Sequence, residues 1–336
     1  MRHLHLFNDF NIEVNKYFNL NGNTHKNPWV SYAKDKKRVR YNEPGFLSTP
    51  LTFEIVESGE IKWSNTSGPI ERVNPIEYSI NGGEWVELAK PEGQATSISV
   101  TTGDIVRFRG DNVGYGSNYE DVHEPGHEQW TESARYYSFK GTTCGFIVYG
   151  NVMSLINKTS FEKLNTIPGS FAFENMFRDC TGLISAEYML LPATTLSNGC
   201  YHAMFMGCSN MLYTPKELPA TVLSLRPYTY MFSNCSSIKT TPIIRGVELT
   251  DIYMNNGCYG RMFENCSSLE SIICLAEDIT TYQTSDPTDN LFCWVNGVQT
   301  TSGTFYKSPN MSNWPVGTSS NSYHGVPQNW TVVNYT

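Results

Sequence analysis

A motif of about eleven residues occurs four times in the C-terminal half of this 336-residue chain. Each copy carries an aromatic residue, then Met-Phe, Cys and an apolar residue: "FENMFRDCTGL" (173–183), "YHAMFMGCSNM" (201–211), "YTYMFSNCSSI" (228–238) and "YGRMFENCSSL" (259–269). Their cysteines, Cys180, Cys208, Cys235 and Cys266, are 28, 27 and 31 residues apart. Such a period predicts a solenoid, in which each unit buries its apolar face only against its neighbours.

The positions that the four copies share are predicted to form the repeat core. In the second copy, apolar residues starting at Cys200 stand at i, i+1, i+4, i+5 and i+8. This spacing predicts one stripe of a short helix, followed by an extended segment. The predicted core residues are Met176, Phe177, Cys180, Met204, Phe205, Cys208, Met231, Phe232, Cys235, Met262, Phe263 and Cys266.

The nine cysteines are interpreted as packing residues. No CxxC pair is present, and the close pairs, such as Cys200 and Cys208, are eight residues apart without a further Cys or His at zinc-ligand spacing. Free cysteine behaves as a small, commonly buried hydrophobe. Disulfides formed after release into an oxidising medium stay open as an alternative, and Cys144 and Cys293 receive no role. We therefore expect no metal and no cofactor.

Alternating apolar residues predict an antiparallel β-sandwich over residues 46–150. Leu51, Phe53 and Ile55 share one face of a strand, and Asn81-Gly82-Gly83 is a strong hairpin signal between two further strands. A polar and aromatic loop, residues 112–137, interrupts this pattern, and long loops on a rigid scaffold often bind ligands. The candidate ligand contacts in or at the end of this loop are Tyr115, Tyr119, Trp130, Tyr136 and Tyr137.

The same loop holds the densest polar cluster of the chain, "YEDVHEPGHEQW" (119–130). A His-x3-His pair, His123 and His127, would suit zinc if it lay on a helix. Pro125-Gly126 stands between the two histidines and breaks helical register. An exposed acidic loop is therefore favoured over a metal site, and contact with a ligand or partner is the third reading.

Residues 1–45 are basic, with a net charge of +4 in a chain whose total is -8. Two short β-type runs around a charged turn predict a hairpin, which is marginal alone and should pack on a partner. The start of the chain does not resemble a secretory signal, no apolar stretch is long enough for a membrane span, and an acidic chain is not expected to bind nucleic acid. The predicted docking residues are Trp29, Tyr32, Lys36, Lys37, Arg38, Arg40 and Tyr41.

The four "MFxxC" units, the "LPAT" turns at 191–194 and 218–221 and the closing "CWVNGV" to "GVPQNW" segment (293–330) resemble the BspA-like leucine-rich repeat proteins of Bacteroidetes and their crAss-like phages. The similarity extends to the strand pattern before the repeats and covers residues 50–336. It departs at Arg226-Pro227, which replaces Gly-Cys, and at about four extra residues near 250–256. The resemblance implies a short, locally irregular and capped array.

These observations together predict a β-rich α+β chain in three parts: an anchor hairpin (1–45), the sandwich (46–150) and the capped leucine-rich-repeat solenoid (151–336). The resemblance implies a non-enzymatic phage structural protein, a head fibre or tail fibre made in the host cytoplasm and carried on the virion surface. Its expected partners are capsid or tail proteins, further copies of itself, and a host-surface glycan or protein. The alternatives are a secreted bacterial adhesin at the cell surface and, less favoured, a carbohydrate-active enzyme, for which no local catalytic motif is present.

Overall fold

The computed structural model describes residues 46–65, 75–88, 95–112, 137–167, 169–246, 248–249, 257–277, 293–311, 314 and 325–336. The chain divides into two compact units, Met1–Asn42 and Glu43–Thr336, and every described residue belongs to the second. Within the described residues this unit is rich in strands, and its helices are the short 3-10 helices η3 (Val152–Leu155) and η4 (Phe161–Lys163). The prediction of a β-rich chain is confirmed.

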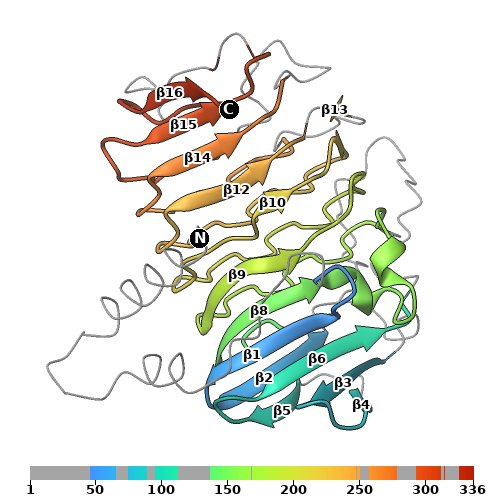
Figure 1. The fold of residues 1–336 in the computed structure, drawn as a ribbon. Helices are drawn as coiled ribbons and strands as arrows, with labels where there is room; N and C mark the ends of the chain where they lie inside the picture. Colours follow the sequence, from blue (N-terminus) through green and yellow to red (C-terminus); the bar gives the residue numbers. More distant parts are fainter. Residues whose placement is uncertain are drawn as a thin grey trace, which may run out of the picture. The chain divides into compact units, whose positions relative to one another are not determined.

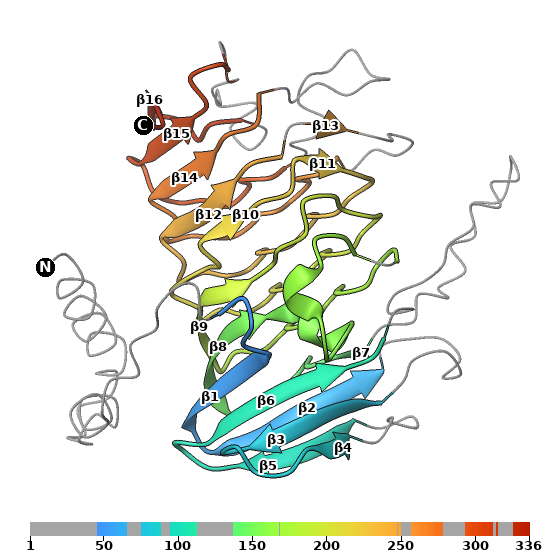
Figure 2. The ribbon, with the colours of Figure 1, turned by 45° about the vertical axis from the view of Figure 1, so that its right-hand side comes forward.

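The first half of the unit contains two sheets (Figure 2). One runs β4-β3-β6-β1-β8, formed by Val86–Leu88, Ile76–Ile80, Ile105–Gly110, Leu51–Glu57 and Gly145–Asn151, all antiparallel. The other runs β5-β2-β7, formed by Thr96–Val100, Gly59–Asn65 and Tyr137–Ser138. Phe53 of the first sheet and Trp63 of the second are both buried, and both rings contact Phe139. The two sheets therefore share one core.

Two turns explain how this half is connected. At the β3–β4 hairpin, Asn81 and Gly82 both adopt positive φ, 55° and 75°, as a tight two-residue hairpin turn requires. The turn between β5 and β6 instead carries the chain from one sheet to the other, because β5 pairs with β2 whereas β6 pairs with β1 and β3. Asp104 closes this turn by accepting hydrogen bonds from the backbone and hydroxyl of Thr101.

In the second half, parallel strands follow one another in chain order (Figure 1). β9 (Leu183–Leu190) pairs in parallel with β8, so the first sheet continues into the repeats. A five-stranded parallel sheet then runs β10-β12-β14-β15-β16, formed by Glu217–Leu218, Thr240–Ile244, Ser271–Cys274, Thr304–Lys307 and Thr331–Asn334. A smaller parallel pair joins β11 (Val222–Leu223) to β13 (Glu248–Leu249).

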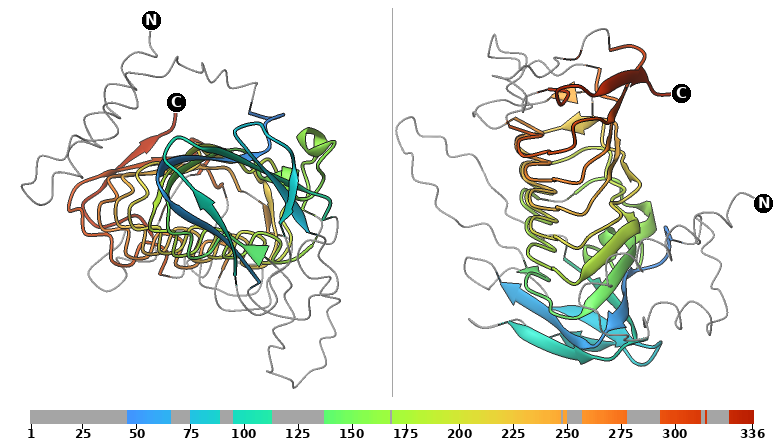
Figure 3. Two further views of the ribbon diagram at one scale, coloured as in Figure 1. Left: turned by 90° about the horizontal axis from the view of Figure 1, so that it is seen from below. Right: turned by 90° about the vertical axis from the view of Figure 1, so that its left-hand side faces the viewer.

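The motif itself forms consecutive turns, so the prediction of a short helix in each copy is wrong. The backbone adopts positive φ at every fourth residue, for example 54° at Asn175 and 57° at Asp179. Backbone amides that point along the array donate hydrogen bonds to carbonyl groups of the next copy. The amide of Phe177, for example, donates to the carbonyl of Met204 (2.8 Å). The amides that alternate with these donate within their own turn. The amide of Cys180, for example, donates to the carbonyl of Phe177 (3.1 Å). Figure 3 shows these turns stacked in a column.

The turns place the shared side chains in the core. All twelve predicted core residues are fully buried. The rings of Phe177, Phe205, Phe232 and Phe263 stack with centroid separations of 5.4, 5.3 and 5.7 Å. The motif cysteines lie in a neighbouring column, where each thiol donates to a carbonyl of the preceding copy. Cys208, for example, donates to Phe177 (3.1 Å), and Cys235 donates to Phe205 (3.0 Å).

The column begins before the first recognisable motif. Phe139 stacks on Phe177 (5.9 Å), its amide donates to the carbonyl of Met176 (2.8 Å), and its carbonyl accepts the thiol of Cys180 (3.1 Å). Gly141 takes the positive φ (73°) that this position of the turn requires. Residues 139–142 therefore act as the turn on which the first repeat stacks. The expected domain boundary at residue 150 lies at the end of β8, which pairs with β1 on one side and β9 on the other.

Candidate functional site

Only some of the predicted site residues lie within the described part of the chain. The seven predicted docking residues, Trp29, Tyr32, Lys36, Lys37, Arg38, Arg40 and Tyr41, lie outside the described residues, as do Tyr115, Tyr119, Trp130 and Tyr136 of the loop. Of Tyr137 the backbone is described, and it pairs with Asn65 between β7 and β2. The predicted contacts of these residues with partners or ligands stay predictions.

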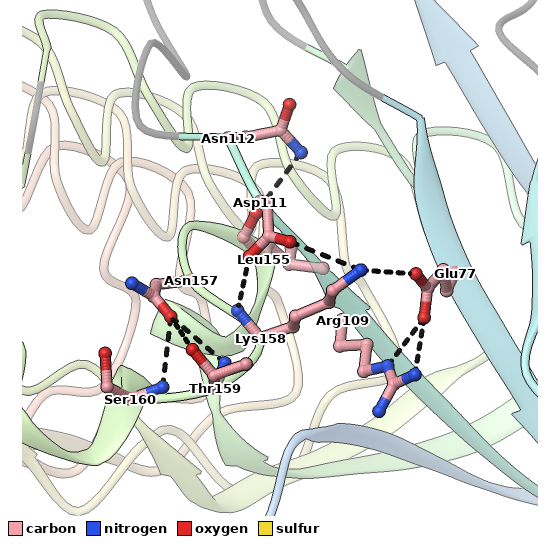
Figure 4. A network of polar contacts seen from close by, with 9 residues as sticks. All are labelled: Glu77, Arg109, Asp111, Asn112, Leu155, Asn157, Lys158, Thr159 and Ser160. Carbon is pink, nitrogen blue, oxygen red and sulfur yellow. Dashed lines mark hydrogen bonds and ion pairs between the residues drawn. The ribbon is translucent and has the colours of Figure 1, made fainter.

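A polar network lies where the described chain leads into the 112–137 loop (Figure 4). Glu77 of β3 is its centre: one carboxylate oxygen accepts from Arg109 (2.7 Å), and the other accepts from the Lys158 ammonium (2.7 Å). Lys158 also contacts Asp111 (3.2 Å). The backbone amide of Asn112 donates to the carbonyl of Ile156 (2.8 Å), so the residues that follow β6 are bonded to the end of η3. The network thus fixes the start of the loop to the region between the sheets and the repeats.

The same contacts set the charge states in the network. The hydrogen bond from Lys158 lowers the pKa of Glu77 below its usual value of 4.5, with a further contribution from Arg109. The bonds to Glu77 and Asp111 raise the pKa of Lys158. Both shifts favour the charged forms of Glu77 and Lys158 at neutral pH, as expected for a structural clasp rather than a general acid or base.

We expect Glu77→Gln to remove part of the acid sensitivity of the fold. Because the pKa of Glu77 is lower in the folded chain, its contribution to stability is present above about pH 4.5 and is lost as pH falls through the lowered pKa. At pH 7 the urea concentration at the unfolding midpoint should be higher for wild type than for the variant. This difference between the two midpoints should become smaller toward pH 3 and with added salt. Glu84→Gln, at an exposed carboxylate in the β3–β4 turn, is the control. A pH-independent difference for Glu77→Gln would contradict the assignment.

The cysteines form no metal centre within the described ranges, where no cluster of three or more His, Cys, Asp or Glu side chains has metal-binding geometry. All nine thiols are free, and eight of them are buried. Burial raises the pKa of Cys180, Cys200 and Cys258 to about 12, which suppresses the reactive thiolate. The described residues also contain no helix long and apolar enough to cross a membrane.

One thiol should therefore react in the native protein. Cys293 is half-buried, whereas the other eight cysteines are inaccessible. Titration with a thiol-specific chromogenic reagent at pH 8 is expected to modify Cys293 alone, and the remaining eight after unfolding in guanidinium. Mapping of the labelled peptide identifies the site. Rapid native modification of several cysteines would mean that the repeat core opens readily.

The solvent-facing side of the parallel sheet is the candidate binding surface. In β14 and directly after it, Ser271, Ile273 and Leu275 are partly exposed, and the residues that alternate with them are buried. In β15, buried Phe305 lies between partly exposed Thr304 and Tyr306. In β16 no residue is fully buried, and Val332 is the side chain that packs against the core. We define the outer sheet face as Glu217, Thr240, Ile243, Arg245, Ser271, Ile273, Leu275, Thr304, Tyr306, Thr331, Val333 and Tyr335.

The parallel register arranges this face in rows that cross the strands. The hydroxyl row consists of Thr240, Ser271, Thr304 and Thr331, which are partners in consecutive strand pairs, and the apolar row consists of Ile243, Ile273, Tyr306 and Val333. The ring of Tyr335 meets that of Tyr306 edge-on, with 6.3 Å between the centroids. Each of these four strands therefore contributes one hydroxyl and one apolar side chain. The two are two residues apart in β14, β15 and β16 and three apart in β12, where the register shifts.

The two charged side chains of the outer sheet face are paired with each other, and Lys239 beside the face is paired as well, whereas Lys307 of β15 donates to the carbonyls of Ser308 and Met311. Arg245 donates to Glu217 (2.6 Å), and Lys239, next to the hydroxyl row, lies 3.3 Å from Glu270. These pairs leave the described part of the face close to neutral. A neutral surface of hydroxyl and apolar groups suits binding by van der Waals contact and hydrogen bonds rather than by charge.

The repeat motif does not reveal this surface, because the motif residues point into the core. The sequence contains a weaker indication of the strands that form this surface. Short β-type runs follow the motifs at "ESIIC" (270–274), "TFYK" (304–307) and "TVVN" (331–334). Their side chains alternate between the two faces of a sheet, but the sequence does not state which strands are neighbours or in which register.

Comparison with known proteins adds no relative: the chain matches no protein-family model, and no curated protein or solved structure is significantly similar to it.

Proposed function

We propose that residues 151–336 form a short, capped leucine-rich-repeat solenoid of the BspA-like type and that the chain is a non-enzymatic adhesion protein on a phage virion. The motif resemblance supports the family, and the parallel strands and stacked turns support a solenoid. Residues 1–45 dock on a capsid or tail protein in this proposal. The repeats then present the outer sheet face to the surface of the host cell.

The observation that carries the adhesive role is the outer sheet face itself. It combines a registered hydroxyl row, a registered apolar row and a Tyr306–Tyr335 ring pair on one side of a rigid sheet. The solvated face of a sheet commonly carries polar residues, whereas Ile243, Ile273 and Val333 are apolar and partly exposed on this face. Such half-exposed apolar groups contribute to binding when a partner covers them.

Adhesion is tested by binding of the purified chain to Bacteroidetes cells. Wild type is expected to sediment with the cells, and Tyr306→Ala with Tyr335→Ala is expected to reduce the bound fraction about tenfold, which equals about 1.4 kcal/mol. Weak contacts add up when many copies are displayed, so the assay uses both the free chain and the chain coupled to beads. Equal binding by wild type and the double variant would exclude this face as the adhesive surface.

The virion assignment is tested separately by peptide mapping and immunogold labelling of purified phage particles. The intact chain is expected on particles, and cross-links from Lys36 or Lys37 should reach a capsid or tail protein. A chain found only in a bacterial envelope would support the bacterial adhesin instead.

A further inference from the structure

The rows of the outer sheet face repeat at the distance between strands. Neighbouring strands lie about 4.8 Å apart, and the register from β14 through β15 to β16 has no slip. Between β12 and β14 the register shifts once, and Thr240 and Ile243 still pair with Ser271 and Ile273, so both rows reach β12. Hydroxyl and apolar side chains therefore recur at this interval along a line that crosses the strands at a right angle. A ligand that uses all the rows must repeat its own groups at nearly the same interval.

This interval distinguishes between two kinds of extended polymer. An extended peptide advances by about 3.3 Å per residue and presents side chains to one face about every 6.7 Å, so it loses register with the rows within a few strands. In an extended β-1,4-linked pyranose chain, each sugar advances by nearly the strand spacing. Neighbouring sugars are rotated about the chain axis, but each of them still presents ring C–H groups and rim hydroxyls. A polysaccharide laid across the sheet can therefore place one sugar over each strand.

The chemistry of the rows fits a pyranose ring. Each sugar has an apolar face of C–H groups and a rim of hydroxyls, and each strand offers an apolar side chain beside a hydroxyl, as Tyr306 and Thr304 do in β15. Tyrosine adds a large, rigid contact area at a low cost in conformational entropy. Arg245 and Glu217, the two charged residues of the outer sheet face, pair with each other, which favours a neutral sugar over an acidic one.

We propose that the outer sheet face binds a neutral, extended β-1,4-linked polysaccharide that runs across the strands from β12 to β16 with one sugar per strand. The inference rests on the proposed adhesive function and names its ligand class and the direction of the bound chain. The hydroxyl row bonds the rim of successive sugars, and the apolar row packs against their C–H faces. Binding adds up over strands, so its strength depends on the length of the ligand.

The test uses neutral β-1,4-linked gluco-, xylo- and manno-oligosaccharides from disaccharide to hexasaccharide, titrated into the full chain by calorimetry. In at least one series, affinity should rise about tenfold or more between disaccharide and tetrasaccharide and then level off, because the sites over the strands are filled. The α-1,4-linked gluco-oligosaccharides, which curve, serve as the linkage control and should bind weakly at every length.

Two matched substitutions locate the bound chain. Val333→Asp places a charge in the apolar row on β16, the last strand of the parallel sheet, and should lower the affinity for the tetrasaccharide about tenfold or more. Val86→Asp places the same charge on exposed β4, the last strand of the first sheet, and should leave the affinity unchanged. Equal thermal midpoints of both variants and wild type show that lost binding is not lost folding.

The outcomes separate this inference from the adhesive function. Absence of binding in all three β-linked series, affinity independent of length, or equal effects of the two valine variants would overturn the polysaccharide proposal. If cell binding then persists, depends on Tyr306 and is abolished by protease treatment of the cells, the face binds a protein and the adhesive function stands. If the chain binds neither cells nor oligosaccharides, both proposals fail.

Discussion

Replacement of Gly182 by alanine is expected to destabilise the unit by about 3 kcal/mol or more, because the new methyl group has no space. A Cβ at this position would overlap the carbonyl oxygen of Cys144 and lie 2.9 Å from its carbonyl carbon. Both atoms belong to backbone that leads into β8, so a change of rotamer cannot relieve the contact. The amide of Phe146 also donates to the carbonyl of Gly182 (2.9 Å), at the start of the β8–β9 pair.

The measurement is urea unfolding followed by circular dichroism, with Gly83→Ala as the control. Gly83 lies in the exposed β3–β4 turn, where a Cβ would meet only the carbonyl oxygen of Ile80 at 3.2 Å. This contact needs a shift of a few tenths of an ångström, so the control should change stability by about 1 kcal/mol or less. Similar losses in both variants would show that the close approach of Gly182 to Cys144 is not a tight constraint.

Phe205→Ala is expected to cost about 3–5 kcal/mol, since it empties the middle of the ring column. Phe205 is fully buried between Phe177 and Phe232, with nearly parallel rings on both sides. The alanine would leave a buried cavity that solvent does not reach. The turns around it cannot collapse locally, because their backbones are hydrogen-bonded to both neighbouring copies. The free energy of unfolding from urea titration gives the loss.

Two further substitutions separate cavity formation from the loss of stacking. Phe205→Leu keeps much of the volume and should cost clearly less than alanine. Cys208→Ser, in the adjacent cysteine column, exchanges a thiol for a smaller hydroxyl that can still donate to Phe177, and should cost about 1 kcal/mol. Hydrogen exchange should show lower protection in β1 and β8 as well as in the repeats for Phe205→Ala. Loss confined to residues 183–274 would show that the two halves of the core are independent.

The continuous core has a consequence for how the proposed adhesin works. The ring column runs from Phe139, beside the first two sheets, to Phe263 in the fourth copy of the motif. The first sheet likewise extends through β8 into β9. Residues 139–142 and β8 therefore cover the first copy of the motif, and a repeat array built on such a base needs no separate cap at that end.

The amino-acid sequence determined the parts of this structure that depend on which residues avoid water. The 27- to 31-residue period and the twelve buried Met, Phe and Cys positions follow from apolar residues that recur at fixed distances. The β3–β4 hairpin follows from Asn81-Gly82, because this pair adopts positive φ at low cost. These signals are local, and each can be read within one segment of the chain.

Only the tertiary structure decided three other features. Over nine residues, a period of 3.6 and a period of four place the same side chains on one face, so the pattern at Cys200–Cys208 suited a helix as well as turns that bond the neighbouring copies. The role of residues 139–142 as the first turn, and the rows of the outer sheet face, likewise depend on hydrogen bonds between segments distant in sequence. Those hydrogen bonds join backbone N–H and C=O groups, which are common to nearly all residues. The identity of the side chains therefore does not indicate which segments the bonds connect.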